Sequence, residues 1–287
     1  MLQPSPLRKK INYFIFMNAI ALFLTCSSCI SYAAETLHVK IPPVEPSAPT
    51  SIYYSKLLEL ALSKTQATDG PFDITAYSHQ LTKARFEAEL AHNGVVNVVW
   101  SVTSNELEAH LLPIRISLLK DLNSYRIFLI RKEDQPLFDH VKSLEDLRAL
   151  KAGQGSHWRD TDVLLANNLP VVTSPQFEPL FGMLLGKRFD YFPRGLDEVW
   201  NEEKLYAEKG LITEQHLMLH YRSPKYFFVN KHNTALADRI ERGLRIAIAD
   251  GSFDSLLYNT TGYKRGYDEI HSNKRLIFSL KSNDPHF

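Results

Sequence analysis

The chain has 287 residues, with 33 Lys and Arg against 32 Asp and Glu, so its net charge is only +1. A nearly neutral chain lacks the basic surplus that nucleic-acid binding requires, and it forms no polybasic patch for a membrane surface. Its two cysteines, Cys26 and Cys29, both lie near the N-terminus, so the rest of the chain predicts no disulfide, no thiolate nucleophile and no cysteine-ligated metal.

Residues 1–34 have the three-part pattern of a secretory signal. Basic residues at 8–10 precede an apolar run at 11–24, and small residues at 31–34 supply a cleavage site. The apolar run is shorter than the ~20 residues of a spanning helix, although an uncleaved anchor and a lipoprotein signal remain open as alternatives. We expect export to the periplasm and a mature chain with 30 basic against 32 acidic residues.

Strands and helices alternate after this segment. Strands are predicted at 36–41, 72–77 and 95–100, and helices with an apolar period of 3.6 residues at 50–64 and 81–92. Their βαβαβ order predicts a parallel sheet covered by helices. Two extended segments, "IRISL" and "SYRIFLIR", then flank a polar turn.

The pattern starts again at Ser143, where Ser143 and Asp146 resemble a capping box. Helices are predicted at about 158–167, 177–185, 196–207, 236–249 and 253–258, and strands or extended segments from Lys151 and at 170–173, 188–192, 211–221 and 226–229. The strand at 188–192 is expected to end at Pro193, which has no ladder donor.

The same kind of α/β unit thus occurs twice, and the last helices follow the second unit. We expect a first, discontinuous lobe of residues 35–122 plus 222–287 and a second lobe of residues 123–221. The chain would cross between the lobes at the polar turn near Asn123 and again near Tyr221.

Ligands of open α/β sheets bind beyond the carboxyl ends of the strands. The predicted ligand-binding residues are therefore Trp100, Ser101 and Thr103 after the third strand, Gly155, Ser156 and Trp158 in "GQGSHW", Arg194 in "FPRG", and Tyr221 near the second crossing. Arg194 is expected to hold an anion, because a guanidinium group binds a carboxylate or a phosphate with two hydrogen bonds.

The residues of "GQGSHW" complete this prediction. Free N–H groups of Gly155 and Ser156 at a helix N-terminus suit an anion, and Trp158 offers an apolar wall or a cation–π face. Each candidate also has a structural alternative: Arg194 as a loop cap, the tryptophans as core, the glycines as turns and Thr103 as a helix cap.

Signatures of enzymes, cofactors and metals are weak. "GQGSHW" lacks the third glycine of a dinucleotide loop, and it is neither a Walker loop nor a G-x-S-x-G elbow. His216 and His220 lie too far apart along an extended segment to chelate one metal easily. The sequence therefore predicts no catalytic residue, no cofactor and no metal.

The segments "VVWSVTS", "SYRIFLIRK", "GQGSHWRD" and "RFDYFPRG", in this order, resemble the solute-binding protein family 3, which comprises periplasmic binding proteins of the type 2 fold that often serve amino-acid ABC transporters. The likeness covers most of residues 36–281 and is closest to a proteobacterial subgroup with G-Q-G-x-x-W-x-D and F-P-R-G motifs. It implies an α/β fold of two lobes with mixed sheets, joined by a two-stranded hinge, that closes on its ligand.

Three departures from that family concern the ligand. Amino-acid binders of the group usually carry an Arg soon after the position of Thr103, and an Asp where Arg194 stands here. Asn97 occupies a position where many relatives have Asp. The resemblance therefore implies the fold and leaves the amino-acid specificity open.

The sequence as a whole predicts a periplasmic, monomeric solute-binding protein without enzymatic activity. It would capture a small polar or anionic ligand, an amino acid or an organic acid, for ABC-type uptake through a membrane permease. Three alternatives stay open: a ligand-sensing module for a membrane signalling protein, a dehydratase-like enzyme on the same fold, and a paralogue that binds no ligand.

Overall fold

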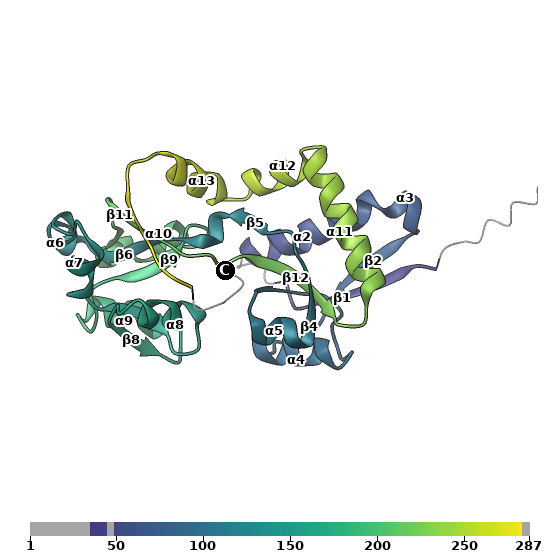
Figure 1. The fold of residues 1–287 in the computed structure, drawn as a ribbon, viewed down its shortest axis with the longest axis horizontal. Coiled ribbons are helices and arrows are strands. Elements are labelled where there is room, and N and C mark those ends of the chain that lie inside the picture. Colours follow the sequence, from purple (N-terminus) through teal and green to yellow (C-terminus); the bar gives the residue numbers. More distant parts are fainter. Residues whose placement is uncertain (1–34, 45–48, 283–287) are drawn as a thin grey trace, which may run out of the picture. The chain divides into compact units, whose positions relative to one another are not determined.

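Parallel and antiparallel strands both occur in the sheets of this protein, seen in a computed structural model that describes residues 35–44 and 49–282 (Figure 1). The expected secretory signal lies outside the described residues. Residues 36–287 form one compact unit. Among the described helices, none has the length and apolar character needed to cross a membrane.

The strands are β1 (Leu37–Ile41), β2 (Phe72–Ala76), β3 (Val99–Val102), β4 (Leu111–Ile114), β5 (Leu118–Asp121), β6 (Tyr125–Arg131), β7 (Ala152–Gly155), β8 (Val171–Ser174), β9 (Phe192–Gly195), β10 (Leu211–Thr213), β11 (Leu217–His220), β12 (Lys225–Asn230) and β13 (Leu276–Ser279). The helices are α2 (Pro49–Lys64), α3 (Gln66–Asp69), α4 (Lys83–Ala91), α5 (Asn105–His110), α6 (Gln135–Asp139), α7 (Leu144–Arg148), α8 (Arg159–Ala166), α9 (Glu178–Leu185), α10 (Val199–Tyr206), α11 (Thr234–Ala249), α12 (Ser252–Asn259) and α13 (Tyr263–His271), with 3-10 turns η1 (Leu122–Ser124), η2 (Lys132–Asp134) and η3 (Ala207–Lys209).

The first predicted sheet is parallel only in part. Strands β1 and β2 pair in parallel, as expected, but β3 pairs antiparallel with β12, which also pairs antiparallel with β4. The predicted strand at 95–100 begins only at Val99 because Asn97 makes side-chain bonds to β1. Its Oδ1 accepts from the Lys40 N–H at 2.7 Å, and its Nδ2 donates to the His38 carbonyl at 3.0 Å.

Helices α2 and α11 lie side by side over this part of the fold (Figure 1). The buried face of α11 includes Ile240 and Leu244, and that of α2 includes Leu57 and Leu58. The two backbones approach closely at Gly243, where a Cβ atom would lie 1.9 Å from the Ala61 carbonyl oxygen. A glycine is required at this crossing for steric reasons.

Strand β6 is the centre of the second sheet. It pairs with β9 along one edge and with β10 and β11 along the other, all antiparallel, and β13 adds to β11 in parallel. The parallel pair β7–β8 continues the sheet through a bridge between Ala152 and Tyr191.

The strand expected at 188–192 is displaced in the structure. Strand β9 begins at Phe192 and runs through "FPRG", so Arg194 lies within an antiparallel strand, opposite Ile127, and does not follow a parallel one. An antiparallel pair alternates between bonded and non-bonded positions, which accommodates a proline whose nitrogen is not needed in the ladder. The Pro193 carbonyl accepts from Gln154 Nε2 at 3.3 Å.

Most helices match the sequence pattern. The capping box at Ser143 and Asp146 is confirmed, with Ser143 Oγ accepting from the Asp146 N–H at 3.2 Å. Helix α13 and strand β13 were not predicted. Because β13 pairs with β11, residues 276–279 belong to the sheet that the sequence assigns to the second lobe; the lobe boundaries themselves stay a prediction.

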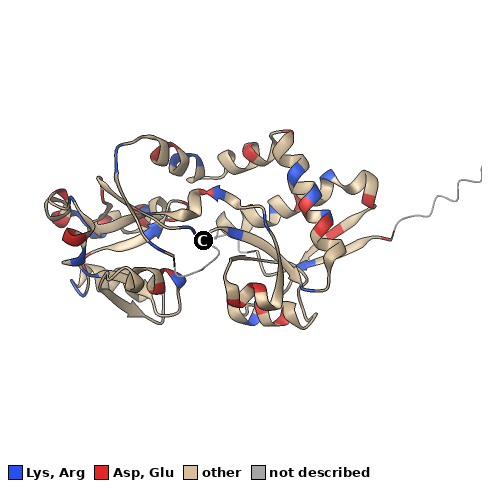
Figure 2. Ribbon diagram, viewed as in Figure 1, with Lys and Arg blue, Asp and Glu red and all other residues tan. Residues whose placement is uncertain are grey.

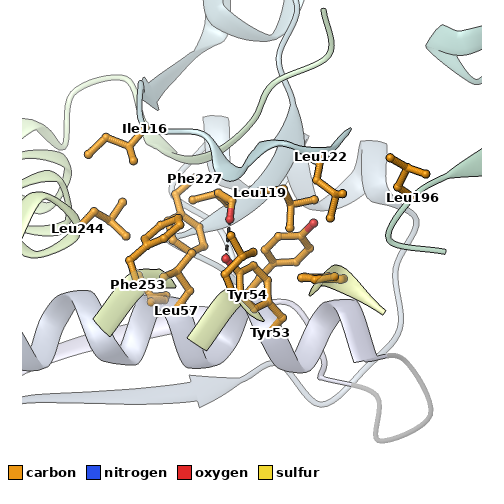
Figure 3. Close-up of a cluster of buried hydrophobic side chains, with 14 of the residues drawn as sticks. Tyr53, Tyr54, Leu57, Ile116, Leu119, Leu122, Leu196, Phe227, Leu244 and Phe253 are labelled. Atoms are coloured by element: carbon orange, nitrogen blue, oxygen red, sulfur yellow. Dashed lines mark hydrogen bonds between the residues drawn. The ribbon is translucent and has the colours of Figure 1, made fainter. Parts of the chain in front are cut away.

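The two predicted crossing segments are bonded to each other. Asn123 Nδ2 donates to the Ser223 carbonyl at 2.5 Å, and the Tyr221 N–H donates to the Ser124 carbonyl at 3.0 Å. Below η1, a cluster of buried side chains surrounds Tyr53 and Tyr54 of α2 (Figure 3). The Tyr53 hydroxyl donates to the Leu118 carbonyl at 2.6 Å, which ties α2 to β5.

Candidate functional site

A cavity of about 420 Å³ opens where β1 and β3 end and α2 begins. Its lining combines hydroxyl, aromatic and charged side chains, among them Thr50, Ser51, Tyr54, Lys83, Phe86, Glu87, Trp100, Ser101 and Lys225. The cavity lies at the carboxyl ends of strands, which is where the sequence argument places a ligand. It contains Trp100 and Ser101, two of the predicted ligand-binding residues.

Two aromatic rings form an apolar surface in this cavity. The rings of Tyr54 and Trp100 lie 5.5 Å apart with an interplanar angle of 33°. Burial raises the pKa of Tyr54 well above its usual range, and nearby Tyr263 and Asp197 act in the same direction. Tyr54 is therefore neutral at any physiological pH.

Two lysines bring positive charge to the same cavity. Lys225 Nζ lies 5.1 Å from the centre of the Tyr54 ring, and no ion pair of the described residues includes Lys225. Lys83 Nζ lies 3.7 Å from Glu87 Oε1. Desolvation of its ammonium group lowers the pKa of Lys83. The Glu87 carboxylate opposes this shift, and the nearby Lys225 and Arg159 charges add to it.

Ser101 and Thr103 have protein partners at the end of β3. Ser101 Oγ donates to Glu87 Oε1 at 2.9 Å, and the Thr103 hydroxyl donates to Glu108. The Thr103 N–H donates to the Pro224 carbonyl at 3.1 Å, and its carbonyl accepts from Arg159 of α8. Ser101 thus faces the cavity, whereas Thr103 joins β3 to α8 and to the segment before β12.

Arg194, the predicted anion-binding residue, is buried with carboxylates as partners. Its Nε and Nη2 donate to Glu202 at 2.6 to 3.0 Å, and Nη2 lies 2.7 Å from Glu198 Oε2. The guanidinium carbon lies about 5 Å from the ring centres of Trp158, Phe177 and Phe192. The carboxylates thus neutralise the charge of Arg194, and the aromatic rings pack around its guanidinium group.

The residues of "GQGSHW" contribute to the packing around Arg194. Trp158 stacks on Phe192 with an interplanar angle of 14°. Gly155 is buried against Trp158, and a Cβ atom on Gly155 would lie 2.4 Å from the indole ring. The Ser156 N–H donates to the Ser174 carbonyl at 2.9 Å, so it belongs to the β7–β8 connection.

Tyr221 belongs to a second buried group of charges. Its hydroxyl donates to Asp160 Oδ1, which also lies 3.1 Å from Arg126 Nη2, and the Arg126 guanidinium carbon lies 5.1 Å from the centre of the Tyr221 ring. Burial by itself would raise the pKa of Asp160, but Arg126 and the Tyr221 hydroxyl lower it overall. Asp160 is therefore a stable anion.

Asp197 differs from every other carboxylate that the structure describes. Both of its oxygens are buried, and neither has a hydrogen-bond partner among the described residues. Burial raises its pKa, as does the adjacent Glu198, although Lys225 and Arg126 partly offset both effects. Because Lys225 and Tyr54 interact electrostatically with Asp197, it lies close to the cavity that they line.

The predicted residues thus fall into separate groups. Trp100 and Ser101 share the cavity; Gly155, Trp158 and Arg194 pack together, with Ser156 beside them; Thr103 and Tyr221 each bond to a residue at the start of α8. Sequence reasoning missed Lys83, Lys225 and Asp197. The position of Lys83 could have been noticed in the sequence. It is the first residue of a helix, where a positive charge is unfavourable because it opposes the helix dipole.

Both signs of charge are interspersed along the described elements, for example on α11 (Figure 2). This distribution agrees with the nearly neutral composition. The two cavity lysines are therefore a local feature of this site, on a molecule without a single-sign field.

No protein-family model and no curated protein sequence match the chain. Solved structures do match it. An ancestral arginine-binding protein bound to arginine has a TM-score of 0.55 and 16% identity, over 80% of this chain and 100% of that chain. The probable amino-acid ABC transporter extracellular-binding protein ytmK from Bacillus subtilis has a TM-score of 0.59 and 17% identity, over 80% and 98%.

A histidine kinase sensor domain with similarity to periplasmic binding proteins also matches, with a TM-score of 0.55 and 14% identity, over 80% of this chain and 97% of that domain. At such identities the likeness shows the fold alone. The chain has the mixed α/β fold of the type 2 periplasmic binding proteins.

Proposed function

We propose that this chain is a solute-binding protein of the periplasm that holds a small polar or anionic solute in the cavity at the ends of β1 and β3. The observation that carries the proposal is the lining of that cavity: an apolar aromatic surface, hydroxyl groups and two lysines at the carboxyl ends of the strands. A volume of about 420 Å³ is in the range of small-molecule sites.

The same proposal includes two lobes that close on the solute. It is supported by the bonded segments around Asn123 and Tyr221, which join β5–β6 to β11–β12. The contact from Arg159 to the Thr103 carbonyl would then form on closure and break on opening. We further propose that the solute passes to an ABC-type permease and that the protein acts as a monomer without catalytic activity.

The first test is a thermal-shift screen of residues 36–287, which form a compact unit, against amino acids, organic acids and small phosphates. A solute at 100 times its dissociation constant adds about 2.7 kcal/mol of stability. We expect a melting temperature that rises with the logarithm of solute concentration. A flat response to all three classes would contradict the proposal.

A sensory role is the second candidate, because the fold likeness extends to a sensor domain of a histidine kinase. The two roles differ in what happens to the solute. If deletion of the gene abolishes uptake of the identified solute, the protein serves transport. If uptake persists and only a transcriptional or behavioural response is lost, it serves sensing.

A further inference from the structure

We propose that Lys83 and Lys225 together form an anion-binding site, and that the solute is therefore a small molecule with net negative charge, bearing a carboxylate or a phosphate group. This inference rests on the proposed function and narrows it. It also moves the anion-binding role from Arg194, where sequence reasoning placed it, to the cavity.

The two ammonium groups line one cavity although they come from distant parts of the sequence. Lys83 is the first residue of α4, and Lys225 is the first residue of β12. Lys225 is partly buried, its Nζ lies 5.1 Å from the centre of the Tyr54 ring, and no ion pair of the described residues includes it, although the Asp197 charge acts on it from outside the cavity lining. A partly buried cation without a carboxylate partner is costly unless a ligand supplies the anion.

Glu87 does not neutralise both lysines. It lies 3.7 Å from Lys83, beyond normal hydrogen-bond length, and the same oxygen accepts from Ser101 Oγ at 2.9 Å. Glu87 is the one carboxylate beside two ammonium groups among the described residues that line the cavity, so the lining has a net positive charge. Asp197 lies outside this lining, and its raised pKa favours its neutral form. An oxyanion between the lysines would restore neutrality and would receive charge-assisted hydrogen bonds.

The surroundings favour negative charge as well. Thr50 and Ser51 lie in the first turn of α2, a 16-residue helix with no acidic residue in that turn, and both line the cavity. The N-terminal end of such a helix carries partial positive charge. The positive charge of Arg159, which interacts electrostatically with Lys83, also favours an anion here.

Arg194 does not offer an equivalent site. Its Nε and Nη2 groups are paired with Glu202 and Glu198, and the guanidinium group is buried among aromatic rings. An incoming anion would have to displace Glu202 and leave this carboxylate unpaired in the interior, which costs several kcal/mol. The cavity lysines require no such displacement.

The test is isothermal titration calorimetry on residues 36–287 with five probes: succinate, L-glutamate and inorganic phosphate as anions, and L-arginine and L-lysine as cations. Lys83→Met and Lys225→Met remove one charge each and keep an unbranched side chain that is one atom shorter. Lys56→Met is the matched control, because Lys56 is an exposed lysine of α2 outside the cavity lining.

We expect at least one anionic probe to bind, and each cavity variant to bind it about tenfold more weakly, or worse, which corresponds to losing one charge-assisted hydrogen bond. Lys56→Met should bind like the unchanged protein. Preference for succinate and L-glutamate over phosphate would identify the group as a carboxylate, and the reverse preference as a phosphate.

Three results would overturn the inference. These are binding of a cationic probe alone, anion binding that neither cavity variant weakens, and no binding of any anionic probe. The first leaves the proposed function standing, because a solute is still bound. Failure of the proposed function itself is recognised separately, by a flat response in the thermal-shift screen to every class of solute.

Discussion

Arg194 lies among carboxylates and aromatic rings, and this environment changes what its replacement should do. If Arg194 held an anion, as expected from the sequence, Arg194→Ala would weaken ligand binding and leave the fold intact. In the structure the same change leaves Glu202 buried without its partner. Breaking a buried pair from one side costs about 3–5 kcal/mol, so we expect a large loss of stability.

The measurement is urea unfolding of Arg194→Ala beside the control Arg188→Ala. Arg188 is exposed, and its truncation should stay within about 0.5 kcal/mol of the unchanged protein. If the Arg194→Ala variant unfolds at the same urea concentration as the control but no longer binds the solute, Arg194 is a ligand-binding residue after all.

Asp197 gives a prediction that depends on pH. Its pKa is raised in the folded state by burial and by Glu198. Below the unfolded-state pKa of about 4 the carboxyl group is mostly protonated in both the folded and unfolded states. As pH rises from there through the raised folded-state pKa, ionisation favours the unfolded state over the buried group, so the free energy of unfolding falls.

Asp197→Asn should therefore raise the melting temperature at pH 7 but not at pH 4. Asp238→Asn, at an exposed carboxylate of α11, is the control and should change little at either pH. Equal melting temperatures for Asp197→Asn and the unchanged protein at pH 7 would show that Asp197 has partners that satisfy its charge.

At the scale of elements, the contact between α2 and α11 depends on one glycine. Gly243→Ala would place a Cβ atom 1.9 Å from the Ala61 carbonyl oxygen, so the helices must separate. Overpacking of this kind costs about 1–3 kcal/mol. Gly182→Ala on α9 meets no atom within 4 Å and gains helix propensity, so it should stabilise the protein by up to about 1 kcal/mol.

Opposite shifts of the melting temperature for the two Gly→Ala variants would verify this packing. Equal shifts of the same sign would mean that α2 and α11 do not cross as closely as described.

The elements that sequence reasoning predicted well are those with a strong local pattern. The apolar period of α2, the amphipathic α11 and the capping box at Ser143 are all local features, and the structure confirms them. The strand predicted at 188–192 begins only at Phe192 in the structure. The first and last residues of β9 are determined by its pairing with β6, which is distant in the sequence. For the same reason β13, whose partner is β11, gave no local signal.

The candidate site was predictable in its place but not in its chemistry. The rule of strand ends led to Trp100 and Ser101, which do line the cavity. Lys225 is the first residue of the mostly buried strand β12, and only the pairing of β12 with β3 brings it to that cavity. Arg194 was also expected to follow the end of a strand and face the ligand. In the structure its partners are Glu198 and Glu202, which follow it in the chain.

The whole molecule has the fold of the type 2 periplasmic binding proteins and a cavity with two lysines in its lining, which we propose to bind an anion. The buried groups around Arg194 and Asp160 stabilise the second sheet and the start of α8. We propose that the accessible lysines of the cavity, and not the buried arginines, bind the solute.

The most direct measurement is a crystal structure of residues 36–287 with the solute that gives the largest thermal shift. We expect an acidic group of that solute to lie within hydrogen-bond distance of Lys225 Nζ and Lys83 Nζ, beside the Trp100 ring, while Arg194 keeps its bonds to Glu202. A solute bound to Arg194, with Glu202 displaced and both lysines without contact to it, would contradict the claim.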